Sequence, residues 1–97
     1  MRTVSWNKIA RQDYFEIIEF LSLNWSEKEV QNFIDKVYDI RSILVKGNVE
    51  FQSTDRIGIK RCVINKQITL FYKIVNESHV ELLRFWNNSK NMRSLKY

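Results

Sequence analysis

The spacing of apolar residues changes once along this chain, close to Phe51, and that change constrains the fold more than any other feature. Up to residue 47 the apolar residues recur every three or four positions, which is typical of helices. After Phe51 they alternate with other residues, which is typical of strands. A chain of 97 residues has room for one domain. The sequence therefore predicts a single α+β domain over residues 1–97, in which the helices precede most of the strands.

Two helices are predicted before residue 47. The first runs from Asn7 to about Ser22, and its acidic residues fall largely between the apolar ones. Its apolar stripe consists of Ala10, Tyr14, Ile17, Ile18 and Leu21. The second begins at Ser26, a capping residue followed three positions later by Glu29, and ends at Gly47. Because only a short loop separates the two helices, we expect an antiparallel hairpin.

Three strands are predicted after Phe51, over residues 57–64, 67–75 and 79–86, and a short N-terminal strand is predicted over Thr3–Trp6. The short turns between the three strands make neighbouring strands antiparallel. We therefore expect the order β-α-α-β-β-β, with the helical hairpin packed on one face of a three- to four-stranded, mainly antiparallel sheet. The other face of the sheet is expected to be open to a partner. Residues 87–97 are expected to form a polar, basic tail.

The net charge of +5 lies entirely in the second half of the chain. Residues 1–50 contain seven Lys and Arg against eight Asp and Glu, whereas residues 51–97 contain nine against three. Lys60, Arg61, Lys73 and Arg84 lie within the predicted strands. This asymmetry predicts a basic sheet surface that receives an anionic macromolecule.

The composition disfavours several classes of protein. The chain has no apolar run of about 18 residues, so no membrane span is expected, and its N-terminus lacks the apolar stretch of a secretory signal. With one cysteine, one histidine and two glycines, it offers no internal disulfide, no usual zinc site and no nucleotide-binding glycine loop. We expect a cytoplasmic protein without a metal or cofactor.

Some residues that often carry chemistry have a simpler interpretation here. Cys62 lies inside an alternating strand, where a small buried side chain is favoured over a nucleophile. His79 begins a strand beside a turn, where a solvated or singly bonded imidazole is favoured over a general base. Phe71 and Phe85 are expected in the core. Trp86, at the end of its strand, is expected to be exposed.

The order of elements and two stretches of sequence resemble the RelE/ParE superfamily of toxins from type II toxin–antitoxin systems. The first stretch is the helical segment Ala10–Leu21 (ARQDYFEIIEFL), and the second extends from Ile59 to Asn91. The second includes LFYKI at Leu70–Ile74 and VELLRFW at Val80–Trp86. The resemblance covers nearly the whole chain. It implies a cognate antitoxin partner whose acidic, amphipathic tail covers the toxin.

The resemblance implies one of two activities. RelE-like members are ribosome-dependent endoribonucleases that cut mRNA without a metal, using strand lysines and arginines and often a C-terminal tyrosine. In this alternative, Lys60, Arg61 and Arg84 would stabilise phosphate charge, with His79 or Tyr97 as the acid or base. ParE-like members lack that catalytic set and poison DNA gyrase through protein contacts.

The sequence departs from the RelE pattern, since Thr69 and Cys62 stand where that pattern has an arginine and a lysine. We therefore predict a ParE-like, growth-inhibiting toxin that binds a macromolecular target, with gyrase as the first candidate and the ribosome with its mRNA as the second. The residues predicted at the contact lie near the end of the last strand: Arg84, Trp86, Asn87, Asn88, Lys90 and Arg93. A third alternative is a nontoxic relative that binds RNA or a peptide.

Overall fold

The helices and strands follow the order predicted from the sequence, with one further short strand. The computed structural model describes residues 1–47, 49–89 and 95. The elements are β1 (Thr3–Trp6), α1 (Lys8–Asn24), α2 (Glu27–Lys46), β2 (Gln52–Ser53), β3 (Ile59–Val63), β4 (Ile68–Asn76) and β5 (His79–Asn87). The N-terminal strand and the three C-terminal strands are confirmed. The two-residue strand β2 was not predicted, because a pair of exposed polar residues has no alternating pattern.

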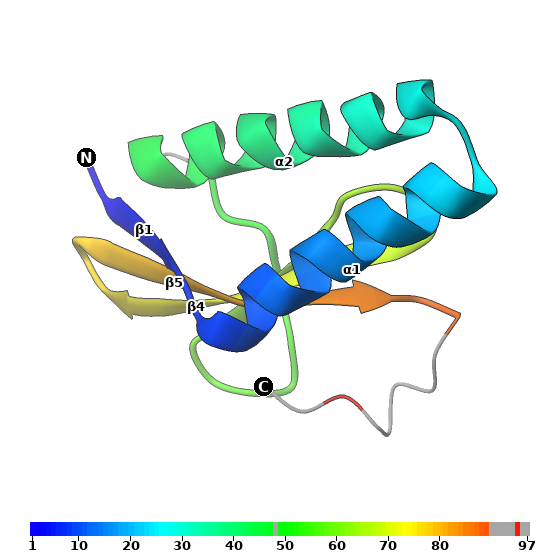
Figure 1. Cartoon of the computed structure of the whole chain (residues 1–97). Coiled ribbons are helices and arrows are strands. Elements are labelled where there is room, and N and C mark those ends of the chain that lie inside the picture. The colour runs from blue at the N-terminus through cyan, green and yellow to red at the C-terminus, as the bar shows by residue number, and fades with distance from the viewer. Residues whose placement is uncertain (48, 90–94, 96–97) are drawn as a thin grey trace.

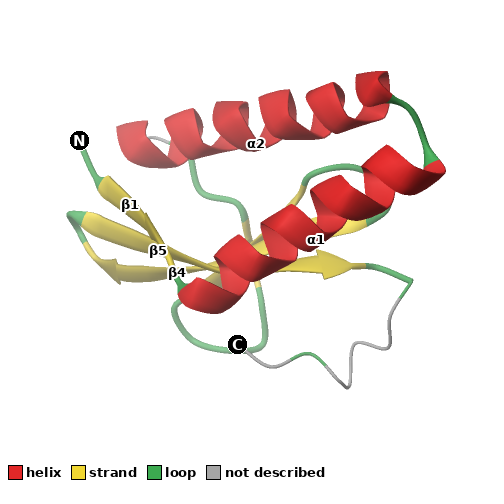
Figure 2. Ribbon diagram, in the orientation of Figure 1, coloured by secondary structure: helices red, strands yellow, loops and turns green. Residues whose placement is uncertain are grey.

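The strands form one five-stranded sheet in the order β1-β5-β4-β3-β2. Strands β2 to β5 pair antiparallel, and β1 pairs parallel with β5. The helical hairpin connects β1 to the rest of the sheet and lies on one side of it, as Figures 1 and 2 show. The α+β architecture expected from the sequence is therefore confirmed.

The caps predicted at Ser26 and Gly47 are present, and Asn7 caps the first helix. The Asn7 side chain accepts a hydrogen bond from the Ala10 N–H at 2.7 Å, and the Ser26 hydroxyl accepts one from the Glu29 N–H at 3.4 Å. Gly47 ends α2 with φ of 74°, a left-handed conformation that favours glycine. A Cβ at Gly47 would also meet the Arg2 side chain at 3.0 Å.

The main core lies between the helices and the sheet. The buried stripe of α2 consists of Phe33, Val37, Ile40 and Leu44, at the three- and four-residue spacing of one helix face. The sheet contributes alternate residues of β4 and the apolar residues of β5 that face the helices. These are Ile68, Leu70, Tyr72, Val80, Leu82 and Phe85. Phe85 is thus a core residue, as predicted.

A second apolar cluster lies on the opposite face of the sheet, which we call the outer face. This outer cluster consists of Ile59, Phe71, Leu83 and Trp86, all buried, and Leu95 packs against it. Successive strand residues point to opposite faces, so these side chains point away from the helices. The expectation that Trp86 is exposed is wrong, because only 4% of its surface is accessible. Leu95 lies in the segment predicted as a polar tail.

A β-bulge in β5 explains why both faces of this strand are apolar. Phe71 pairs with Arg84 and Tyr72 pairs with Leu82, which leaves Leu83 without a partner on β4. Before the bulge the even-numbered Leu82 faces the helices, and after it the odd-numbered Phe85 does. Strict alternation along the sequence cannot reveal this change of phase.

Neither helix, among the residues that the structure describes, has both the length and the apolar character needed to cross a membrane.

Replacing Phe33 with alanine should lower the free energy of unfolding by about 3–5 kcal/mol, because it removes a large side chain that is only 2% exposed. Tyr38→Ala, on the same helix at 66% exposure, is the matched control and should cost less than about 1 kcal/mol. Urea denaturation followed by circular dichroism measures both. Equal losses would show that α2 faces the sheet differently.

Candidate functional site

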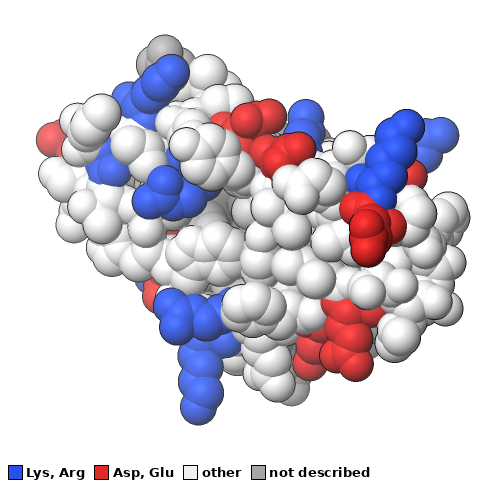
Figure 3. Space-filling view, turned by 45° about the horizontal axis from the view of Figure 1, so that its top comes forward, with Lys and Arg blue, Asp and Glu red and all other residues white. Residues whose placement is uncertain are grey.

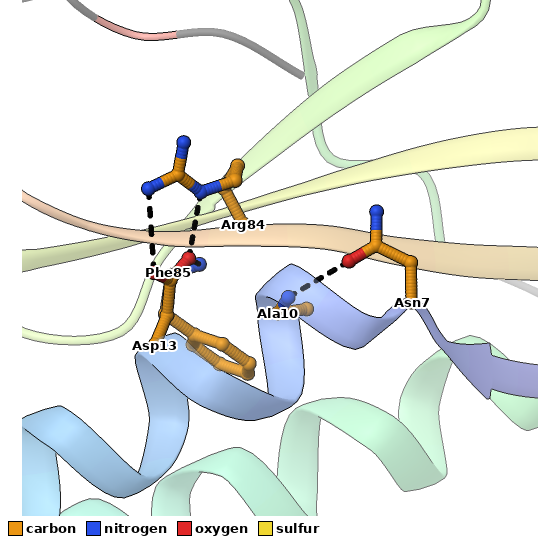
Figure 4. Close-up of polar contacts among 5 residues, drawn as sticks. All are labelled: Asn7, Ala10, Asp13, Arg84 and Phe85. Atoms are coloured by element: carbon orange, nitrogen blue, oxygen red, sulfur yellow. Dashed lines mark hydrogen bonds and ion pairs between the residues drawn. The ribbon is translucent and has the colours of Figure 1, made fainter.

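Arg84 lies where the edge of β5 is no longer covered by β1. The pairing of β1 with β5 ends at Leu82. Beyond Leu82, α1 crosses the same edge of β5. There the Asp13 carboxylate of α1 accepts three hydrogen bonds (Figure 4). The donors are Arg84 Nε at 2.7 Å, Arg84 Nη2 at 3.3 Å and the backbone N–H of Phe85 at 3.1 Å. Asp13 therefore accepts the hydrogen bond from the Phe85 N–H that a neighbouring strand would otherwise accept.

The Asp13–Arg84 pair is largely shielded from water. The side chains of Arg84 and Asp13 are 17% and 11% exposed. The Arg84 guanidinium also lies over the Trp86 ring, with its Cζ 5.2 Å from the ring centre. Arg84 thus joins α1, β5 and the outer cluster.

The acidic residues of α1 were expected to fall largely between the apolar ones, but Asp13 is buried. A signal was present in the sequence. Asp13 lies three residues after Ala10 and four before Ile17, so it shares their helix face. An acidic residue inside an apolar stripe indicates a buried polar partner.

The two candidate cations of β3 do not lie on the same face of the sheet. Lys60 and Arg61 are adjacent in β3, so their side chains point to opposite faces of the sheet. Lys60 lies on the helix side and donates from Nζ to the Ser53 hydroxyl at 2.8 Å. Arg61 lies on the outer face with Ile59.

His79 lies at the opposite end of β5 from Asn87. Its Nε2 is 2.7 Å from the Ser5 hydroxyl of β1. The imidazole is therefore singly bonded among the described contacts, as expected, and it is separated from Arg84 along the strand.

Cys62 faces the main core, which confirms its interpretation as a small buried side chain. Burial raises the pKa of its thiol from 9.0 to about 11, against a smaller lowering by the Lys36 ammonium. A thiol with this pKa is almost wholly protonated at neutral pH and is a poor nucleophile.

Two asparagines predicted at the contact have local structural roles. The Asn88 amide oxygen accepts from the buried Thr69 hydroxyl at 2.8 Å, and its amide nitrogen donates to the Lys66 carbonyl at 3.3 Å. Asn87 accepts from the backbone N–H and the hydroxyl of Ser89 at 2.9 and 2.7 Å. The predicted residues Lys90, Arg93 and Tyr97 lie outside the described residues.

The four strand cations do not all lie on one face in the part of the chain that the structure describes. Lys60 lies on the helix side, whereas Arg61, Lys73 and Arg84 lie on the outer face, because Phe71 of the outer cluster pairs with both Arg61 and Arg84. Arg84 is also paired with Asp13. Lys73 also stands opposite Glu81 in the sheet. Figure 3, in which α2 is tilted toward the reader, shows Lys and Arg in several separate places with Asp and Glu between them. Within residues 1–47, 49–89 and 95, no group of three potential metal ligands comes together.

Comparison with known proteins identifies the fold. No family model and no curated protein sequence matches this chain. Its structure, however, is similar to a chain of the chromosomal ParDE toxin–antitoxin system from P. aeruginosa, with a TM-score of 0.71 and 12% identity over 90% of this chain and 96% of that one. It is similar to a chain of the E. coli DinJ-YafQ complex at a TM-score of 0.62 and 9% identity, over 92% of this chain and 96% of that one. A YoeB/ParE toxin from Agrobacterium tumefaciens is similar at a TM-score of 0.60 and 17% identity, over 90% of this chain and 98% of that one.

These similarities extend over nearly the full length of each chain. At such low sequence identity, these structural similarities establish the fold alone. The protein has the two-helix, mixed-sheet fold of RelE/ParE-like toxins, which confirms the fold implied by the resemblance in sequence.

Replacing Asp13 with asparagine should lower the free energy of unfolding by about 1–3 kcal/mol. The change keeps the shape of the side chain but removes the negative charge that pairs with the shielded Arg84 guanidinium. Glu19→Gln, an exposed acidic residue on the same helix, should change it by less than about 0.5 kcal/mol. Chemical denaturation measures the free energy of unfolding of both variants. Similar losses for the two would mean that the Asp13–Arg84 ion pair contributes nothing to folding.

Alkylation of Cys62 by iodoacetamide at pH 8 should be about 100-fold slower in the native protein than in urea. The raised pKa lowers the thiolate fraction by about that factor, and burial slows the reaction further. Mass spectrometry of timed samples measures the rate. The native rate should rise with pH up to about 11. A native rate equal to the denatured one at pH 8 would contradict the burial of this side chain.

Proposed function

We propose that this protein is the toxin of a toxin–antitoxin system, that it inhibits growth by binding a macromolecular target, and that a cognate antitoxin neutralises it. The first support is the fold, which the chain shares over 90% or more of its length with the toxins compared above. DNA gyrase is the first candidate target, as for the ParE-like members of the superfamily.

The observation that favours binding over RNA cleavage is the separation of the candidate catalytic residues. Cleavage of a phosphodiester without a metal requires a base, an acid and a cation within reach of one phosphate. Lys60 and Arg61 point to opposite faces of the sheet. His79 is the first residue of β5, at the opposite end of the strand from Asn88. Arg84, the strand cation nearest the Asn88 end, is engaged by Asp13.

The end of β5 remains our proposed contact with the target. Asn88 is exposed and Asn87 is partly exposed, and Lys90 and Arg93 follow them in sequence. Trp86 and Arg84 support this end from within, because Trp86 is buried and Arg84 is held between Asp13 and the Trp86 ring. A charge reversal of Arg84 would place a carboxylate beside Asp13 and destabilise the fold, so Arg84 is a poor site for testing target binding.

Induced expression of the protein in bacteria tests this proposal. We expect growth arrest with a DNA-damage response and with mRNA that primer extension finds intact. Lys90→Glu combined with Arg93→Glu should reduce the arrest at least about tenfold in viable counts, because a basic contact is reversed. Lys8→Glu combined with Lys28→Glu makes the same charge change on the helices and should leave the arrest unchanged.

Each other outcome overturns a stated part of the proposal. Cuts inside codons during the arrest would identify an mRNA endoribonuclease instead. Normal growth at a verified level of folded protein would identify a nontoxic relative. Equal arrest by both double variants would remove Lys90 and Arg93 from the contact.

A further inference from the structure

The end of β1 and the first half of α1 border a hollow whose walls are mostly aromatic rings. It is lined by Trp6 of β1 and by Arg11, Tyr14 and Phe15 of α1, and we call it the aromatic hollow. Its volume is about 410 Å³, within the range of about 300–1,000 Å³ that is typical of small-molecule sites. Trp6 is the last residue of β1, and α1 begins two residues later, so the short connection between them (Figure 1) brings these side chains together.

The Tyr14 ring stands nearly perpendicular to both of the other rings. It meets the Trp6 ring at 82°, with ring centres 5.1 Å apart, and the Phe15 ring at 75°, with ring centres 5.5 Å apart. A planar ring that enters the hollow therefore finds aromatic faces and aromatic edges in different orientations. Stacking on a face and contact with an edge are both favourable arrangements for aromatic pairs.

Two of the three rings are held in place by the main core. The centre of the Trp6 ring lies 5.4 Å from that of Phe85, and the centre of the Tyr14 ring lies 5.4 Å from that of Phe33. Trp6 and Tyr14 are partly buried, whereas Phe15 is 60% exposed and presents most of its surface to solvent. Walls that are already in position lower the entropic cost of binding a ligand.

Arg11 gives the aromatic hollow a positive charge. It precedes Tyr14 by three residues and Phe15 by four, so it lies next to both on the surface of α1. Its side chain is exposed, and the ion pair recorded among the described residues, Asp13–Arg84, does not involve it. The four residues that line the hollow include no acidic one. The Arg11 guanidinium is therefore in a position to pair with an anionic group of a ligand.

Rings and charge together favour a planar ring that carries an anion. Aromatic walls alone would suit an organic cation, but the Arg11 guanidinium would repel it. An uncharged apolar group would leave the guanidinium without a partner. A nucleotide meets both requirements, because its base stacks on aromatic side chains and its phosphate accepts two parallel hydrogen bonds from an arginine.

We propose that the aromatic hollow binds a nucleoside monophosphate group, either as a free nucleotide or as the phosphorylated 5′ end of a single strand. The base would lie among the rings of Trp6, Tyr14 and Phe15, and the phosphate would pair with Arg11. None of these four residues is among those predicted at the target contact, so the site is distinct from the one in the proposed function.

Adenosine 5′-monophosphate is the first probe. Added to the full chain at millimolar concentration, it should shift the NMR signals of the Trp6 indole N–H, Arg11 and Phe15 more than signals elsewhere. Adenosine, which lacks the phosphate, should bind at least about tenfold more weakly, because it cannot make charge-assisted hydrogen bonds to Arg11. Added salt should weaken binding of the nucleotide but not of adenosine. Shifts centred on other residues, or equal binding of the two probes, would overturn the proposal.

Variants of exposed residues test the hollow without disturbing the core. Arg11→Gln should weaken nucleotide binding at least about tenfold and leave adenosine binding unchanged, whereas Phe15→Ala should weaken both at least about fivefold. The matched controls are Arg41→Gln and Tyr38→Ala, which alter an exposed arginine and an exposed aromatic residue three positions apart on α2. Circular dichroism verifies that every variant is folded. Equal binding by site and control variants would contradict the proposed site.

Two further probes identify the source of the ligand. Tighter binding of a short, 5′-phosphorylated single-stranded RNA than of the mononucleotide supports a strand end as the ligand, and equal or weaker binding supports the free nucleotide. A dipeptide of phenylalanine and glutamate offers a ring and an anion from a protein. Tighter binding of this dipeptide than of the nucleotide would overturn the proposal.

Nucleotide binding and growth arrest are separate outcomes. Arg11→Gln should still arrest growth, because Arg11 is not part of the proposed target contact. A chain that binds the nucleotide in the aromatic hollow but does not arrest growth would overturn the proposed function alone. A chain that arrests growth but does not bind the nucleotide would overturn this inference alone.

Discussion

The contact of Asp13 with Arg84 and the Phe85 N–H determines how the two layers of this protein meet. Strand β1 covers only the first half of the β5 edge, ending at Leu82. Beyond it, a buried backbone N–H would lack a partner at a cost of about 1–3 kcal/mol. Asp13 supplies that partner, and Arg84 supplies the counter-charge that makes a shielded carboxylate tolerable. One side chain of α1 thereby fixes the helical hairpin on the sheet.

The same contact bears on function. Arg84 is the strand cation closest to the end of β5, where the predicted target-binding residues lie. With its guanidinium bonded to Asp13 and packed over Trp86, it acts as a support for that end of the strand. The outer cluster and Asn88 support the same region from the other face and from the β3–β4 turn. Contacts from α1, the outer face and the β3–β4 turn thus hold this end of the strand.

Much of the fold could be predicted because it depends on local signals. The helix spacing, the caps at Ser26 and Gly47 and the alternation after residue 57 each involve neighbours in sequence. The features that escaped prediction depend on distant residues. The bulge at Leu83 places Trp86 on the outer face, where the outer cluster and Leu95 bury it. Asp13 meets Arg84 across 71 positions of sequence. The candidate site was predicted less well than the fold, because charges counted along a chain do not reveal the faces on which they lie.

The central functional claim is that the protein acts by binding its target and does not cleave mRNA. The most direct measurement adds purified protein to two reactions, DNA supercoiling by purified gyrase and translation of a defined message. The account predicts that supercoiling falls as the protein concentration rises, while the message keeps its full length. Unchanged supercoiling together with cuts in ribosome-bound mRNA would contradict it.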